Sequence, residues 1–195
     1  ARKAARKVLA TPCVVGWSPL RGGWRALVQS FPRGGFSIDR SSWDWTVQPW
    51  LVELWERFVW DMHPGAPDWW QTAVLKRFTA LFYDARFQFS DGTKVRQAVP
   101  GIMKSGCYLT LLLNSVSQTM LHAIVMSRLG RDPFENIPWC AGDDTLMDPC
   151  DYEDDYYREL QNLCVVKEAE NTEGYCEFIG FLYDVTGFYP AYRNK

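Results

Sequence analysis

The sequence has no basic excess, although it is rich in charged residues. Its 195 residues include 21 Lys and Arg against 23 Asp and Glu, which gives a formal net charge of −2. A protein that binds nucleic acid unaided usually carries a clear positive charge. The composition therefore disfavours a self-sufficient nucleic-acid binder, unless a local patch such as Arg2, Lys3, Arg6 and Lys7 or segments outside this chain supply the basic surface.

Residues typical of zinc sites and of membrane spans are also scarce. There are two histidines and six cysteines, and no cysteines stand at Cys-x-x-Cys spacing, so we predict reduced thiols and no zinc site. The most apolar stretch starts at Tyr108 but is interrupted by Asn114, Ser115, Ser117 and Gln118. We therefore predict neither a signal peptide nor a transmembrane helix.

The chain has enough apolar material for a core, because 47% of its residues are hydrophobic and 15% are aromatic. No repeat or linker divides it, so residues 1–195 are predicted to form one compact unit. The first residue is Ala, and residues 1–10 have the composition of a helix already in progress. We interpret the chain as a fragment of a longer protein.

Periodicity and turn residues predict an α+β fold with a small antiparallel sheet backed by helices. Helices are expected over 45–62, with Ser41 and Asp44 as its cap and Pro49 in or near its first turn, and over 68–85, 108–129 and 152–164. Strands are expected over 34–39, in hairpins at 87–96 and 138–147, and near 165–166 and 177–183, and loops with short strands over 11–33.

Three carboxylates are the strongest candidates for chemistry. Asp143 and Asp144 are adjacent at a predicted hairpin turn that exposes both, and Asp39 ends a predicted buried strand. Gly-Asp-Asp alone is also a common solvated turn. A carboxylate at the end of a buried strand favours the other interpretation, in which these oxygens bind Mg²⁺ or Mn²⁺ for two-metal phosphoryl transfer.

A second group of polar residues lies where a loop becomes a helix. Ser105 and Gly106 are in the loop, and Thr110 and Asn114 follow at helical spacing. Residues four positions apart share one helix face, so a hydroxyl and an amide could meet one ligand. The alternative is that Thr110 bonds to its own helix and that Asn114 is simply exposed.

These residues occur in a recognisable order: Asp39-x4-Asp44-Trp45, then Lys104-Ser105-Gly106-x3-Thr110-x3-Asn114-Ser115, then Gly142-Asp143-Asp144. The series resembles the palm motifs of RNA-dependent RNA polymerases of positive-strand RNA viruses. The segment from Asp39 to Val47 is especially similar to the sobemovirus, polerovirus and related group. The resemblance extends from about Gly34 to Met147.

The resemblance implies a role for each matching residue. Asp39, Asp143 and Asp144 would be catalytic metal ligands, and Lys167 would be the general acid that protonates pyrophosphate. The nucleotide-binding set would comprise Asp44, Ser105, Gly106, Thr110 and Asn114, with Asp44 and Asn114 recognising the ribose 2′-hydroxyl. An exposed lysine beside Glu168 is also compatible with a simple solvated charge.

The resemblance also implies a palm core over about 34–62 and 98–183, with a fingers-like insertion over about 63–97. The activity would be template-directed RNA synthesis in viral genome replication, with RNA template, nascent RNA, ribonucleoside triphosphates and other viral replication proteins as partners, in a replication complex in the host cytoplasm. The basic finger motif has no counterpart in 1–35 and little chain follows Tyr183, so the isolated fragment is expected to be inactive.

Two other functions remain possible from the sequence. A reverse transcriptase would have aromatic residues at positions 44 and 141, where this chain has Asp44 and Ala141. A non-catalytic RNA-binding or scaffold protein would have a solvated Gly-Asp-Asp turn and widely separated carboxylates. The distance between the carboxylates therefore distinguishes the enzyme from the scaffold.

Overall fold

The computed structural model describes residues 9–192. Residues 1–8, with the basic patch Arg2, Lys3, Arg6 and Lys7 and most of the helix predicted over 1–10, lie outside that range. The described residues divide into two compact units, the first made of residues 9–41 and 108–192 and the second of residues 42–107.

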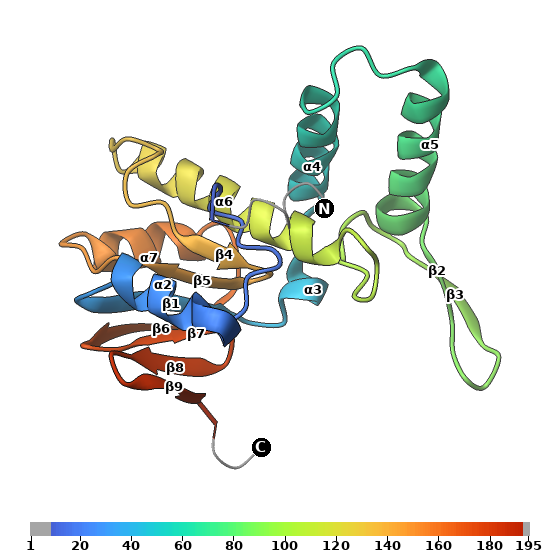
Figure 1. Cartoon of the computed structure of the whole chain (residues 1–195). Coiled ribbons are helices and arrows are strands. Elements are labelled where there is room, and N and C mark those ends of the chain that lie inside the picture. The colour runs from blue at the N-terminus through green and yellow to red at the C-terminus, as the bar shows by residue number, and fades with distance from the viewer. Residues whose placement is uncertain (1–8, 193–195) are drawn as a thin grey trace. The chain divides into compact units, whose positions relative to one another are not determined.

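The first unit is built on a four-stranded antiparallel sheet (Figure 1). Its strands in spatial order are β4 (Trp139–Ala141), β5 (Asp144–Met147), β1 (Gly34–Arg40) and β6 (Val166–Glu173). The central strand β1 therefore lies between the hairpin that carries Gly142 and Asp143 and the edge strand β6. This order places Asp39 on β1 and Asp144 on β5, two of the predicted carboxylates, in one sheet.

The two faces of the sheet follow from the strand register. Phe36 pairs with Met147 and Ile38 with Thr145, so these side chains share one face, and Ser37 and Leu146 point to the other. Helices α6 (Thr110–Arg128) and α7 (Glu153–Gln161) pack against each other, and they contact β4 and β6 respectively.

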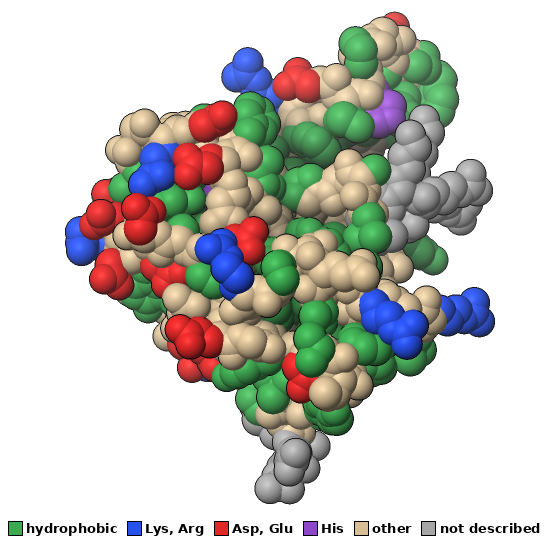
Figure 2. All heavy atoms as spheres, turned by 60° about the vertical axis from the view of Figure 1, so that its left-hand side comes forward, with side chains coloured by type: hydrophobic (Ala, Val, Ile, Leu, Met, Phe, Trp, Pro, Cys, Tyr) green, Lys and Arg blue, Asp and Glu red, His purple; other side chains and the backbone are tan. Residues whose placement is uncertain are grey.

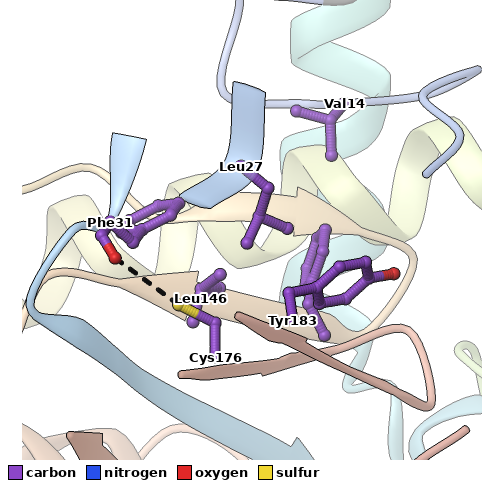
Figure 3. Close-up of a cluster of buried hydrophobic side chains, with 7 residues drawn as sticks. Val14, Leu27, Phe31, Leu146, Cys176 and Tyr183 are labelled. Atoms are coloured by element: carbon purple, nitrogen blue, oxygen red, sulfur yellow. Dashed lines mark hydrogen bonds between the residues drawn. The ribbon is translucent and has the colours of Figure 1, made fainter. Parts of the chain in front are cut away.

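A hydrophobic cluster fills the other side of the sheet. It involves α2 (Gly23–Ser30), which follows the 3-10 helix η1 (Leu20–Gly22), and the meander of β7 (Cys176–Phe178), β8 (Phe181–Asp184) and β9 (Gly187–Pro190). Figure 3 labels Val14, Leu27, Phe31, Leu146, Cys176 and Tyr183, which meet there, and Phe178 belongs to the same cluster. Their burial fixes the meander against β1 and β5.

The second unit is mainly helical. Its elements are α3 (Trp43–Thr46), α4 (Pro49–Asp61), α5 (Asp68–Phe78), the π-helical turn η2 (Thr79–Tyr83), and a hairpin of β2 (Arg86–Gln88) and β3 (Lys94–Arg96). Trp55, Phe78 and Phe82 are buried, with the Trp55 and Phe82 ring centroids 5.2 Å apart. The unit contains the range 63–97 that the sequence predicts as an insertion, and that assignment stays a prediction.

The predicted α+β class is confirmed, and so are the hairpins at 87–96 and 138–147. The single helix predicted over 45–62 is wrong, because the chain forms α3 and then restarts at Pro49, which occupies the first turn of α4. The predicted cap is wrong as well. The residue before α3 is Ser42, in a left-handed conformation and without a side-chain cap hydrogen bond.

Two other elements differ from the prediction. Residues 11–33 contain the helix α2, where only loops and short strands were expected. Strand β6 is eight residues long instead of a short strand near 165–166. It is an edge strand whose side chains are mostly exposed and half of which are charged, so its sequence lacks the apolar alternation of a strand. Within residues 9–192, no helix is both long and apolar enough to cross a membrane.

Candidate active site

Asp39 and Asp144 line one cleft of the first unit. Ile38 pairs with Thr145 in the β1–β5 ladder, so Asp39 and Asp144 are the next residues at the same end of the two neighbouring strands. The cleft has a volume of about 340 Å³, and its other charged lining residues are Lys167, Glu168, Glu170 and Glu177. Two residues distant in sequence thus contribute carboxylates to one acidic pocket.

Asp143 lies in the turn between β4 and β5. Gly142, with a φ of 72°, allows the tight reversal. The Gly142 amide donates a hydrogen bond of 2.9 Å to Ser115 Oγ on α6, and that hydroxyl donates to Leu111 O at 2.7 Å. Helix α6 therefore holds the turn in place. Both Asp143 and Asp144 are half-buried, so the expectation that the turn exposes both is wrong.

A β-bulge directs Lys167 towards Asp39. Along β6, Glu168 pairs with Asp39 and Val166 with Arg40, which leaves Lys167 as the extra residue. Its ammonium donates to Asp39 Oδ2 at 2.9 Å and to Glu168 Oε1 at 3.3 Å. The hydrogen bond to Asp39 and then that to Glu168 raise the pKa of Lys167, so the side chain is cationic at neutral pH.

The environment of Asp144 disfavours its charged form. Burial, followed by the charges of Asp143 and Asp39, raises the pKa of Asp144 to about 6. Burial and the nearby charge of Glu170 likewise raise the pKa of Glu177. Several carboxylates therefore lie close together in this cleft, and a bound cation would offset their repulsion.

Arg40 is a second cation in this region and is almost fully buried, with 4% of its surface exposed. It donates to Ile38 O at 3.3 Å, and its charge opposes the rise in the pKa of Asp144. Arg40 and Glu177 were both missed by the sequence reasoning. Arg40 could have been found, because strict alternation after Phe36 and Ile38 places it on the buried face of β1.

A divalent cation fits the chemistry of this cleft. Among residues 9–192, no three Asp, Glu, His or Cys side chains converge closely enough to form a complete metal site. Asp39 and Asp144 nevertheless supply hard carboxylate oxygens from adjacent strands, and their mutual repulsion would be relieved by Mg²⁺ or Mn²⁺.

Asn114 and Thr110 both lie on α6, four residues apart on one face. Asn114 is 4% exposed, and its Oδ1 has no hydrogen-bond partner among the described residues. The alternative that Asn114 is a merely exposed helix residue is therefore wrong. Thr110 is half-buried at the start of the helix.

Asp44, Ser105 and Gly106 belong to the second unit. Ser105 Oγ donates a short hydrogen bond to Asp44 Oδ2, and the Met103 amide donates to Asp44 O at 2.7 Å. The carboxylate of Asp44 thus contacts the Ser105 loop instead of capping a helix. The loop is further held by Lys104, whose ammonium donates to Gln97 Oε1, to Gly101 O at 3.2 Å and to Ile102 O at 2.7 Å.

The first unit therefore has the features of a polymerase palm: an antiparallel sheet, helices that back it, and carboxylates on a central strand and an adjoining hairpin. The model of the family "Viral RNA-dependent RNA polymerase" matches residues 3–160. The chain belongs to this family. Membership of this family implies a general dependence on divalent metal ions.

Related proteins agree with this assignment. The chain is 33% identical to the replicase polyprotein P2AB of Cocksfoot mottle virus over 138 residues, and 33% identical to that of Southern bean mosaic virus over 128 residues. These matches cover 69% and 65% of this chain but 13% and 12% of the two polyproteins. The chain thus spans about an eighth of the length of these relatives.

Solved structures support the fold. The RNA-dependent RNA polymerase of a human picorbirnavirus superposes with a TM-score of 0.67 at 14% sequence identity, over 92% of this chain and 36% of that protein. An insertion-loop deletion mutant of the same kind of polymerase gives a TM-score of 0.67 at 16% identity, over 89% of this chain and 36% of the mutant. At sequence identities this low, the likeness establishes the fold and nothing further.

The raised pKa of Asp144 predicts that Asp144→Asn stabilises the metal-free chain. A folded-state pKa of about 6, against about 4 in an unfolded chain, means that stability falls as pH rises between these values. At pH 7 the full cost is present, and the amide should remove it, with a gain of about 1–2 kcal/mol in unfolding free energy. Urea unfolding in a chelator at pH 7 and pH 4 measures the gain.

Most of the gain should be lost at pH 4, because Asp144 is then protonated in the folded state and about half protonated in the unfolded chain. Asp154→Asn is the matched control, since Asp154 is an exposed carboxylate in the first turn of α7. Its loss should weaken a favourable helix-dipole interaction slightly. Equal unfolding free energies for Asp144→Asn and the unmodified chain at pH 7 would contradict the prediction.

Proposed function

We propose that this chain is the catalytic palm portion of a polymerase that copies RNA from an RNA template during viral genome replication. The observation that carries the proposal is the acidic cleft that Asp39 and Asp144 share across β1 and β5, in a chain of the polymerase family. Neighbouring carboxylates repel each other and destabilise the fold, and a scaffold protein would have no function that requires them. Among the described residues on the face shown in Figure 2, the Lys and Arg side chains stand apart from one another, which fits RNA contacts from other parts of the polymerase.

Asp39, Asp143 and Asp144 would hold Mg²⁺ or Mn²⁺. When bound, two such ions activate the primer 3′-hydroxyl and stabilise the charge on the departing pyrophosphate. The hydrogen bond that the Gly142 amide donates to Ser115 Oγ fixes the turn that presents Asp143. Lys167 would be the general acid that protonates pyrophosphate, and its contacts with Asp39 and Glu168 hold its ammonium at the cleft.

The nucleotide would be recognised by Asp44, Ser105, Gly106, Thr110 and Asn114. The buried Asn114 amide supports a role in binding the ribose, because its Oδ1 lacks a partner among the described residues. The hydrogen bond between Ser105 and Asp44 supports a fixed orientation of that carboxylate. The partners would be RNA template, nascent RNA, ribonucleoside triphosphates and other viral replication proteins, in the host cytoplasm.

The function is tested by assaying the full-length polymerase that contains this chain on a defined RNA template. Labelled ribonucleotides should be incorporated in Mg²⁺ or Mn²⁺, and a chelator should abolish incorporation. Deoxynucleotides should be incorporated at least about tenfold less efficiently. Binding of RNA without any synthesis would favour the scaffold alternative, and preferential use of deoxynucleotides would favour a reverse transcriptase.

A further inference from the structure

Helix α6 carries a row of buried polar side chains. Packing against apolar neighbours does not account for the burial of polar groups. Asn114, Gln118 and His122 follow one another at four-residue intervals, so they lie along one face of the helix. They are 4%, 1% and 0% exposed, respectively. Burial of a polar side chain costs free energy unless a hydrogen bond replaces its contact with water.

Most buried polar groups of α6 are satisfied within the first unit. His122 Nδ1 lies 3.0 Å from Tyr156 Oη, and its Nε2 lies 2.9 Å from Glu135 O. Ser117 Oγ donates to Leu113 O at 2.7 Å. These residues have local structural partners, so their burial requires no further ligand.

Gln118 and Asn114 differ from these residues. Neither Nε2 nor Oε1 of Gln118 has a hydrogen-bond partner among the described residues, and Asn114 Oδ1 also lacks one. Native proteins rarely leave such atoms unpaired. Two of these three atoms are chemically complementary, because Gln118 Nε2 is a donor and Asn114 Oδ1 is an acceptor.

Helix geometry brings these two amides within reach of each other. Every Cα–Cβ bond of an α-helix tilts towards the N-terminus, so a long side chain lies over the residue four positions before it. Gln118 and Asn114 therefore share one helix face, at a spacing at which Gln–Asn pairs form hydrogen bonds on helices. The two atoms do not make this bond in the structure, so forming it requires a change of side-chain rotamer.

We propose that Gln118 is a positioning residue for nucleotide selection. Gln118 Nε2 donates to Asn114 Oδ1 and thereby turns Asn114 Nδ2 towards the 2′-hydroxyl oxygen of the incoming ribonucleotide. The inference rests on the proposed function, which places Asn114 at the ribose. It adds a residue that does not touch the nucleotide but sets the direction of the amide that does.

The test uses Gln118→Met in the full-length polymerase, because Met retains a similar volume and removes both amide atoms. The measurement is the ratio of kcat/KM for a ribonucleotide to kcat/KM for the matched deoxynucleotide. We expect this ratio to fall about three- to tenfold. Thermal stability should fall only slightly, because Met fills a similar volume and the single hydrogen bond that is lost contributes little to stability.

Asn114→Ala and the double variant separate positioning from a general packing effect. Asn114→Ala should lower the ratio by a larger factor, and adding Gln118→Met to it should cause no further fall, because Gln118 then has no amide to orient. Ser117→Ala is the matched control, since it removes a buried hydroxyl of the same helix that bonds to Leu113 O. Its ratio should be unchanged.

The outcomes distinguish two failures. If Asn114→Ala lowers the ratio but Gln118→Met does not, the positioning role of Gln118 is wrong and ribose recognition by Asn114 stands. If Asn114→Ala leaves the ratio unchanged, ribose recognition by Asn114 is wrong and the role of Gln118 falls with it. An equal fall from Gln118→Met with and without Asn114 would also overturn the proposal, because the effect would not pass through Asn114.

Discussion

Asp39→Asn in the full-length polymerase is expected to lower the rate of nucleotide incorporation by at least about 10³-fold. The substitution keeps the shape of the side chain and removes the negative charge that would bind a divalent cation beside Asp144. Single-turnover incorporation on a primed RNA template, measured over a range of Mg²⁺ and Mn²⁺ concentrations, gives both the rate and the metal dependence.

Folding should be almost unaffected by this change. Asp39 is half-exposed, and the interaction that it loses is an ion pair with the exposed Lys167. Ion pairs between exposed side chains contribute little to stability. A loss of activity with unchanged thermal unfolding therefore identifies a chemical role, whereas a parallel loss of both would identify a structural one.

Asp154→Asn again provides a control, because it removes a carboxylate from the same unit outside the acidic cleft. It should retain normal incorporation. Turnover by Asp39→Asn within about tenfold of the unmodified enzyme would exclude a metal-ligand role for Asp39, since ligand loss at such a site costs far more.

The sequence was sufficient to predict the elements that carry the motifs. Strict alternation identified β1, the Gly142-Asp143 turn identified the β4–β5 hairpin, and helical spacing identified α6. These patterns are local, because each depends on residues that are close together in the chain. Their order along the chain was also enough to indicate the polymerase family.

Features that depend on distant residues were not predictable in this way. The charged sequence of β6 does not look like a strand, and it becomes one because β1 offers its free edge. The bulge that directs Lys167 towards Asp39 depends on the same pairing. The missing partners of Gln118 likewise become visible only when the packing around α6 is known.

The pairing of β1 with β6 begins at Gly34, and the backbone conformation of Gly34 leaves no room for a side chain. Gly34 has a φ of 114°, and an added Cβ would lie 1.9 Å from the carbonyl oxygen of Thr172 on β6. That oxygen belongs to the backbone and cannot rotate away. Gly34→Ala must therefore separate the two strands or distort them.

We expect Gly34→Ala to reduce the unfolding free energy by at least about 3 kcal/mol. Urea unfolding of this chain, followed by circular dichroism, measures the change. Gly35→Ala should be less harmful, because its Cβ would meet Leu146 Cδ1, at 2.3 Å, and that methyl group is at the end of a side chain. Repacking of Leu146 should limit the loss to about 1–3 kcal/mol.

Gly174→Ala separates backbone strain from steric overlap. Gly174 also has a positive φ, of 76°, but nothing lies within 4 Å of an added Cβ. It should lose only about 1 kcal/mol, the cost of holding alanine in a left-handed conformation. If Gly34→Ala were no more destabilising than Gly174→Ala, the close approach of β1 to β6 would not be needed for the stability of the fold. The strand pairing that places Lys167 beside Asp39 would then tolerate a wider separation.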